Sequence, residues 1–170
     1  MKHEQRSDRG LRRTLRGIPE WNVAVFALLL NFPWEVLQVP LFTGMADAPH
    51  VQVIEGCLQA TLGDMVIMLI AYESVSFAAH GRLWISTSSG RQLALFTAIG
   101  VVIAAAIEWL ATRGQWFQSW TYSLRLPVVP GVDIGLTPLA QWIVLPLVVA
   151  WFVRRQLAGG ASCHDGWPQS

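Results

Sequence analysis

Charged residues and cysteines are both scarce in this sequence. Charged side chains make up 14% of the 170 residues, against about 25% in typical soluble domains, and the net charge is only +1. Because no strong positive field is present, we expect no nucleic-acid partner. The two cysteines, Cys57 and Cys163, show neither Cys-x-x-Cys nor Cys/His ligand spacing. The sequence therefore predicts no disulfide framework, no metal site and no cofactor.

Long hydrophobic runs, by contrast, are abundant. Hydrophobic residues make up 53% of the chain, and four runs approach the roughly 20 apolar residues that a helix needs to cross a bilayer. These runs cover about residues 21–42, 57–79, 93–111 and 134–153. A soluble protein with four such helices would have too little polar surface to dissolve. The sequence therefore predicts an all-α polytopic membrane protein, with four transmembrane helices in a compact bundle within residues 19–156.

Lys and Arg residues are unevenly distributed around these spans. Six of them lie within the first 16 residues, whereas the loop 43–56 has none. Because positively charged segments stay in the cytoplasm, the basic segment 1–18 and the disordered tail expected at 157–170 are both predicted to be cytoplasmic. This places a multi-pass protein in a bacterial inner membrane. The alternative of a cleaved signal peptide is disfavoured, because the run 21–42 is too long for a signal sequence and contains prolines and a glutamate.

Acidic residues inside the spans are the most informative feature. Ionisable side chains in a bilayer are costly and usually face a bundle interior or a water-filled cavity. Glu35, Asp64 and Glu108 come from three different spans, and the predicted topology puts each of them in the outer half of the membrane. Gln141 of the fourth span lies at a similar depth. The sequence therefore predicts one outer-half cavity with Glu35, Asp64 and Glu108 as candidate catalytic residues, whereas Glu73 belongs to a different environment near the inner surface.

Helical spacing adds further candidates for binding a ligand. Asn31 and Gln38 share a helical face with Glu35, and Thr61 shares one with Asp64. Gln141 would face the same cavity. An alternative interpretation is that these polar side chains only hydrogen-bond the helices together.

The loop 112–132 and one tryptophan complete the candidate site. Trp116, Trp120 and Tyr122 form an aromatic belt at the headgroup level, or else Trp120, Tyr122 and Arg125 form a lid over the cavity. Trp34 stands next to Glu35, so that its aromatic face would stabilise a cation or else face lipid. Thr137-Pro138 fits the first residues of the fourth helix, as a capping residue followed by proline.

Several of these runs resemble known membrane proteins. The runs 31–41 (NFPWEVLQVPL), Gly63-Asp64, Glu108-Trp109 and 136–142 (LTPLAQW) look like a group of small bacterial four-span membrane proteins that have no assigned function. A looser likeness, limited to Asn31-x-x-Trp34-Glu35, is to the membrane-bound cyclases of meroterpenoid pathways. That resemblance implies buried acids that protonate an isoprenoid.

Three functions from different classes are compatible with this pattern. The first is acid/base chemistry on a lipid or isoprenoid-like substrate, since a carboxyl group in an apolar pocket tends to keep its proton. The second is a small proton- or cation-coupled transporter or channel component. The third is a non-catalytic assembly subunit. The expected partners are membrane lipids and a hydrophobic small-molecule ligand, and a homo-oligomer is left open. No nucleophile elbow, His-rich box or zincin motif is present, which argues against the better-marked hydrolases and desaturases.

Overall fold

The protein was examined as a computed structural model, which describes residues 18–116 and 119–162. Within these residues the regular structure is helical, with two isolated bridges as the only β pairing. The long helices are α2 (Pro19–Gln38), α3 (His50–Ala78), α4 (Gly90–Ala111) and α5 (Leu136–Ser162), and two short 3-10 helices are η1 (Val39–Leu41) and η2 (Arg82–Thr87). All four long helices are long and apolar enough to cross a membrane. The predicted all-α, four-span architecture is therefore confirmed.

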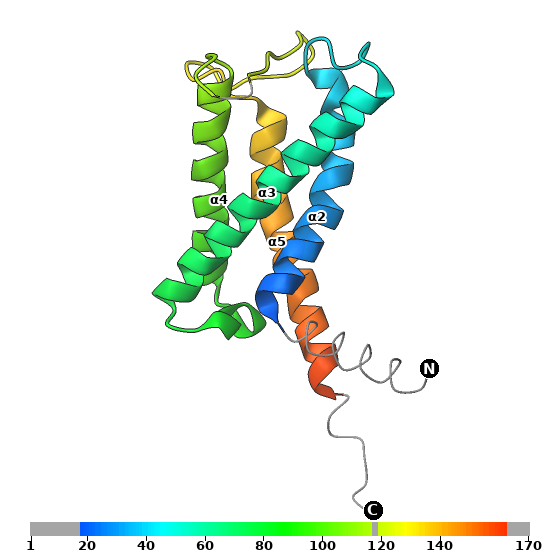
Figure 1. Cartoon of the computed structure of the whole chain (residues 1–170). Helices are drawn as coiled ribbons and strands as arrows, with labels where there is room; N and C mark the ends of the chain where they lie inside the picture. Colours follow the sequence, from blue (N-terminus) through cyan, green and yellow to red (C-terminus); the bar gives the residue numbers. More distant parts are fainter. Residues whose placement is uncertain (1–17, 117–118, 163–170) are drawn as a thin grey trace, which may run out of the picture.

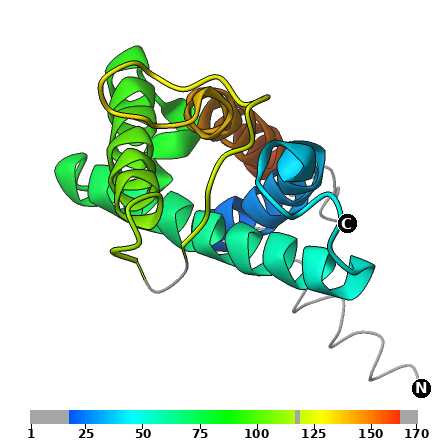
Figure 2. The same ribbon diagram turned by 90° about the horizontal axis from the view of Figure 1, so that it is seen from above.

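The four helices are arranged as a ring in chain order (Figures 1 and 2). Each packs against two neighbours, so that α5 closes the ring against α2. The start of α2, the 3-10 helix η2 and the end of α5 lie at one end of the bundle, called here the terminal end. Residues 39–49, 112–116 and 119–135 lie at the opposite end, called here the loop end. Four spans thus bring both ends of the described chain to one side, as the even number of predicted spans requires.

The second helix begins earlier than predicted. The second helix begins at His50, directly after Pro49, and not at 57, so half of the expected loop 43–56 is helical. Residues 51–56 mix apolar residues with Gln52, Glu55 and Gly56, which hid the helix from a search for apolar runs. The first turns of α3 therefore form part of the loop end, where they add polar side chains.

The fourth helix also differs at both ends. It begins at Leu136, so Thr137 is already helical and its hydroxyl has no hydrogen-bond partner, which corrects the predicted Thr137-Pro138 start. At its other end α5 runs to Ser162, into the tail that was expected to be disordered from 157. Leu157 explains the extension, because it packs against the buried core. Residues 1–17 and 163–170, including Cys163, lie outside the described residues.

Local sequence signals explain how the other helices begin and continue. Pro19 occupies the first turn of α2, where its missing N–H carries no cost. Pro33 lies inside α2, which nevertheless continues to Gln38. Ser89 and Gln92 form a reciprocal capping box at the start of α4.

The buried core fills the bundle between the loop end and the terminal end. Fully buried apolar side chains from all four helices meet there, and they include Val23, Met68, Phe96 and Val149. Gly100 of α4 lies directly against the ring of Trp142, because a Cβ atom at Gly100 would lie 2.5 Å from Trp142 Cε3. This close approach of α4 and α5 fits the small-residue face that leads toward Glu108.

Candidate functional site

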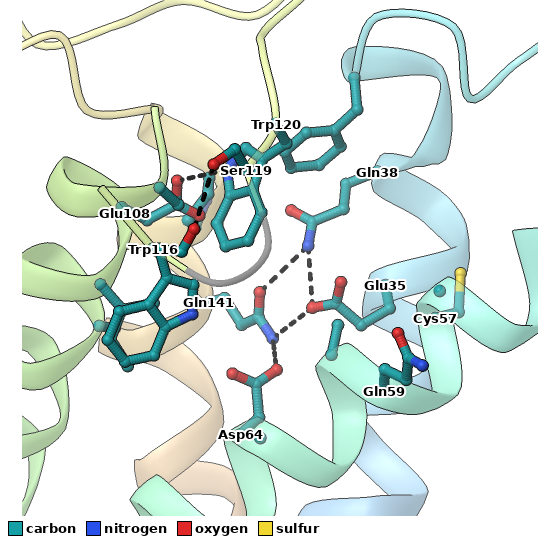
Figure 3. A pocket seen from close by; sticks show the side chains of 18 of the residues that line it. Glu35, Gln38, Cys57, Gln59, Asp64, Glu108, Trp116, Ser119, Trp120 and Gln141 are labelled. Carbon is teal, nitrogen blue, oxygen red and sulfur yellow. Dashed lines mark hydrogen bonds between the residues drawn. The ribbon is translucent and has the colours of Figure 1, made fainter. Parts of the chain in front are cut away.

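A cavity of about 1210 Å³ opens at the loop end between the four helices. Its polar wall is formed by Glu35, Gln38, Asp64, Glu108 and Gln141, which come from all four long helices (Figure 3). The remaining wall is largely apolar and includes the ring of the buried Trp142. Side chains distant in the sequence therefore face one shared cavity.

Gln141 is the centre of the first of two hydrogen-bond clusters. Its Nε2 lies 2.8 Å from Asp64 Oδ2, 2.9 Å from Asn31 Oδ1 and 3.0 Å from Glu35 Oε1. An amide nitrogen carries only two hydrogens, so three oxygens compete for two N–H bonds. Asn31 is held in place from behind, because its own Nδ2 donates to Ala27 O at 2.8 Å.

Gln38 links Glu35 and Gln141 from the cavity side. Its Nε2 donates to Glu35 Oε1 at 2.9 Å and lies 3.4 Å from Gln141 Oε1. The carboxyl groups of Glu35 and Asp64 both accept from Gln141 Nε2, which brings them close to each other. Two acids from α2 and α3 are thus held together by amides from α2 and α5. We call Asn31, Glu35, Gln38, Asp64 and Gln141 the amide–acid cluster.

Glu108 is held in a second cluster, which does not share these amides. Its Oε2 accepts hydrogen bonds from Trp120 Nε1 at 3.0 Å and from the Tyr122 hydroxyl. The same hydroxyl accepts from the backbone N–H of Gly135 at 3.1 Å, immediately before α5. Glu108 therefore ties the end of α4, the loop and the start of α5 to one another.

Residues 121–123 are fixed over the cavity by backbone pairing with residues 41–43, at the end of η1. Thr43 N donates to Thr121 O at 2.9 Å, and Ser123 N donates to Leu41 O at 2.9 Å. The ring of Phe42 packs against the rings of Trp120 and Tyr122. Burial, together with the neighbouring Glu108, raises the pKa of Tyr122, so the phenol keeps its proton and remains a donor to Glu108.

Most of the predicted site residues lie at this cavity. Trp120 and the polar residues of the wall line it, and Asn31 contacts them through Gln141. Tyr122 reaches Glu108 from the loop. Of the three residues of the predicted lid, Trp120 lines the cavity and Tyr122 contacts Glu108, whereas Arg125 does neither.

Five predicted site residues do not line the cavity; Asn31 and Tyr122 contact its wall, whereas Trp34, Thr61 and Arg125 lie elsewhere. Trp34 follows Pro33 on the outer side of α2 and is only half-buried, because adjacent residues of a helix point about 100° apart. Thr61 is buried against α2, beside Leu58 and Phe32, where its hydroxyl has no partner. Arg125 lies exposed in the turn formed by the hydrogen bond from Leu126 N to Ser123 O.

Other lining residues were missed by the sequence analysis. Gln52, Glu55 and Gln59 form a polar rim on the first turns of α3, and Cys57 lies buried beside them. Their spacing of three and four residues was the available signal, but the segment before 57 had been assigned to a loop. Cys57 is a free thiol in the described part of the chain.

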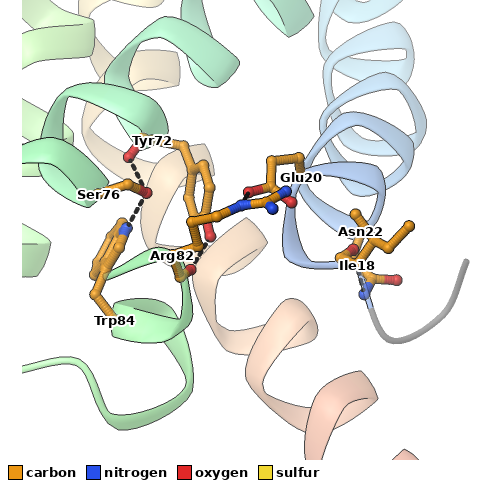
Figure 4. A network of polar contacts seen from close by, with 7 residues as sticks. All are labelled: Ile18, Glu20, Asn22, Tyr72, Ser76, Arg82 and Trp84. Carbon is orange, nitrogen blue, oxygen red and sulfur yellow. Dashed lines mark hydrogen bonds and ion pairs between the residues drawn. The ribbon is translucent and has the colours of Figure 1, made fainter. Parts of the chain in front are cut away.

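The terminal end is closed by a separate polar network (Figure 4). Arg82 Nε lies 2.7 Å from Glu20 Oε1, and the Tyr72 hydroxyl donates to the backbone oxygen of Arg82. Trp84 Nε1 donates to Ser76 Oγ at 3.1 Å. Between this network and the cavity lies the apolar core. Glu73 is exposed and does not line the cavity.

Neither a metal cluster nor a known relative identifies the site. Within residues 18–116 and 119–162, no group of three or more His, Cys, Asp or Glu side chains could hold a metal ion. Comparison of the chain with protein-family models, with curated proteins and with solved structures found no match.

Proposed function

We propose that this protein is a membrane-embedded enzyme that performs acid/base chemistry on a lipid or isoprenoid-like substrate. The observation that supports this most strongly is the pairing of Glu35 and Asp64, from two helices, on the wall of a largely apolar cavity. The likeness of the Asn31-x-x-Trp34-Glu35 segment to the meroterpenoid cyclases points in the same direction.

The acid pair is suited to donate a proton. Two carboxylates within hydrogen-bonding reach, in a site of low dielectric, repel each other unless one of them is protonated. Gln141 and Gln38 supply N–H donors but no positive charge. The pair therefore holds one proton between its oxygens, and this proton can pass to a carbon–carbon double bond of the substrate.

Glu108 is suited to the opposite role. Two donors, Trp120 Nε1 and the Tyr122 hydroxyl, favour its ionised form. A carboxylate in this position can remove a proton from the cationic intermediate, whose charge is stabilised meanwhile by aromatic faces such as that of Trp142. The substrate gains a proton at one carbon and loses a different proton from another carbon. This isomerises or cyclises the substrate without any co-reactant.

The proposed membrane is a bacterial inner membrane. The arginine distribution supports an orientation in which both ends of the chain are cytoplasmic and the cavity lies in the outer half of the bilayer. The loop end would then face outward, and lipids would reach the cavity from the membrane itself.

The transporter and assembly readings have less support. A transporter needs a path to the other side, whereas packed apolar side chains fill the bundle between the cavity and the terminal end. An assembly subunit would bury its polar groups against a partner, whereas here they converge on an internal cavity.

Solvent deuterium provides a test that does not require the substrate to be known. The purified full-length protein is incubated in D₂O with total membrane lipids, and the lipids are analysed by mass spectrometry. Each turnover transfers one deuteron to carbon, so a lipid species should gain one mass unit. Glu35→Gln, Asp64→Asn and Glu108→Gln should abolish the gain, whereas Glu73→Gln, which alters an exposed carboxylate outside the cavity, should not.

An infrared measurement separates the acid pair from Glu108. A band of a protonated carboxyl group should be present at neutral pH and disappear in Glu35→Gln or Asp64→Asn, but persist in Glu108→Gln. A lack of deuterium gain in any lipid, together with unchanged infrared spectra in the three folded variants, would show that the cluster only holds the helices together.

A further inference from the structure

The cavity wall carries negative charge without a positive counterpart. Four acidic residues line it, namely Glu35, Glu55, Asp64 and Glu108, and none of its described lining residues is Lys, Arg or His. The nearest arginine in the sequence to Glu108 is turned away, because Arg113 stacks on Trp109, with its Cζ 4.4 Å from the ring centroid. Arg113 is also bound to the carbonyl of Trp109 through its Nη1 at 3.2 Å.

A buried acceptor in the wall of this cavity has no donor. Gln38 is only 5% exposed, yet its Oε1 has no hydrogen-bond partner although its Nε2 has two. Gln38 lines the cavity, and Figure 3 shows its oxygen turned toward Trp120. A buried acceptor without a donor is costly, so a ligand that donates a hydrogen bond here would restore the missing interaction.

The apolar part of the cavity leads sideways to the outer surface of the bundle. Leu62, Val66 and Ile70 line it from α3 and remain about half exposed, at 51%, 49% and 49%. Ile103 and Ile107 line it from α4. These two helices diverge toward the loop end (Figure 1), so an apolar chain can extend between them toward the surrounding lipid.

We propose that the cavity binds an amphiphile with a long apolar chain and a head that donates a hydrogen bond and bears no negative charge. A hydroxyl group or a protonated amine has this chemistry, whereas a phosphate or diphosphate brings only further negative charge beside the acids. This inference deepens the proposed function and relies on it for the choice of the site. It excludes the phosphorylated isoprenoids as ligands.

Binding can be measured without turnover. The full-length protein in lipid nanodiscs is titrated with geranylgeraniol, geranylgeranylamine and geranylgeranyl phosphate, and binding is followed by tryptophan fluorescence, since Trp116, Trp120 and Trp142 line the cavity. The alcohol or the amine should bind on the order of a hundredfold more tightly than the phosphate, because like charges placed together in a desolvated site disfavour the wrong partner strongly. The stronger of the two shows which donor the site prefers.

Two variants locate the head and the chain. Gln38→Leu removes the free acceptor and should weaken binding of the preferred ligand about tenfold, the value of one hydrogen bond. Gly63→Leu adds a side chain to the wall where a Cβ atom meets nothing within 4 Å, so the fold should persist while binding falls. Glu73→Gln is the matched control and should bind as the unaltered protein does.

The outcomes separate this inference from the proposed function. Equal or tighter binding of the phosphate, or no binding of any probe, overturns the inference. Deuterium transfer to a phosphorylated lipid would overturn it while leaving the acid/base function intact. A third outcome is that the unaltered protein binds the alcohol or amine selectively, that folded Gly63→Leu loses this binding, and that no deuterium transfer occurs. This outcome would support the inference and refute catalysis.

Discussion

Replacement of Gln141 by leucine tests whether the amide–acid cluster holds the bundle together. The substitution keeps a similar side-chain volume but removes both N–H donors from a residue that is 2% exposed. It leaves Asn31, Glu35 and Asp64 without the amide they share. The variant therefore changes hydrogen bonding far more than packing.

The magnitude follows from the number of bonds that the amide can make. Two N–H groups make two good hydrogen bonds at once, at least one of them to a carboxyl oxygen. A hydrogen bond to a charged group contributes about 1.5–3 kcal/mol and a neutral one about 0.5–1.5 kcal/mol, whereas interhelical bonds in bilayers average only about 0.6 kcal/mol. We expect the larger values here, because a buried acid loses its donor and no lipid can replace it. Gln141→Leu should therefore lower the free energy of unfolding by about 3 kcal/mol.

Reversible unfolding in mixed detergent micelles, at neutral and at acidic pH, is the suitable assay. The loss should shrink at acidic pH, since protonated acids can hydrogen-bond to each other without Gln141. Gln52→Leu, on the exposed rim of α3, is the matched control and should change stability by less than about 0.5 kcal/mol. A loss in Gln141→Leu no larger than that of the control would refute the reasoning that the shared amide stabilises the acid pair.

Three further predictions concern the packing, the lid and the topology. Gly100→Ala should cost about 1–3 kcal/mol in thermal or detergent unfolding, because its Cβ would lie 2.5 Å from Trp142 and the ring must shift. Tyr122→Phe should abolish activity while lowering stability only slightly. Because burial and Glu108 raise the pKa of Tyr122, the variant should also lack one tyrosine that ionises well above pH 10 in an absorbance titration. A cysteine in place of Thr87 should stay unlabelled when membrane-impermeant reagents are added to intact cells. Labelling of this cysteine would contradict the predicted orientation.

Depth and helical phase were sufficient to predict that three of the four lining acids face one cavity, whereas Glu55 was missed. Glu35, Asp64 and Glu108 all line the cavity, as their positions along three spans indicated, and Gln141 joins them from the fourth. Both arguments use only the rise and rotation per residue of a helix, which hold regardless of neighbouring helices. They could not show that Gln141 binds two of the acids while the loop binds the third, because hydrogen-bond partners depend on how the helices are rotated against each other.

The errors in the prediction have equally physical causes. Trp34 is adjacent to Glu35 in sequence, but adjacency on a helix turns side chains apart. Arg125 was named as part of the possible lid, yet it lies in an exposed turn, where its charge stays in water. The start of α3 at His50 was missed because a hydropathy search finds only the apolar run that would cross the bilayer. This helix begins before that run.

The division of the three acids into two clusters is what makes a proton-transfer role physically reasonable. Three carboxyls around a single point would compete for the same protons and could not act separately. Here Glu35 and Asp64 share amides from α2 and α5, whereas Glu108 takes its donors from the loop and, through Tyr122, from the backbone just before α5. The two sites can thus act separately, as the proposed function requires. Because the donors to Glu108 belong to the segment that covers the cavity, the contacts that would stabilise an ionised Glu108 in the proposed reaction also hold this segment in place.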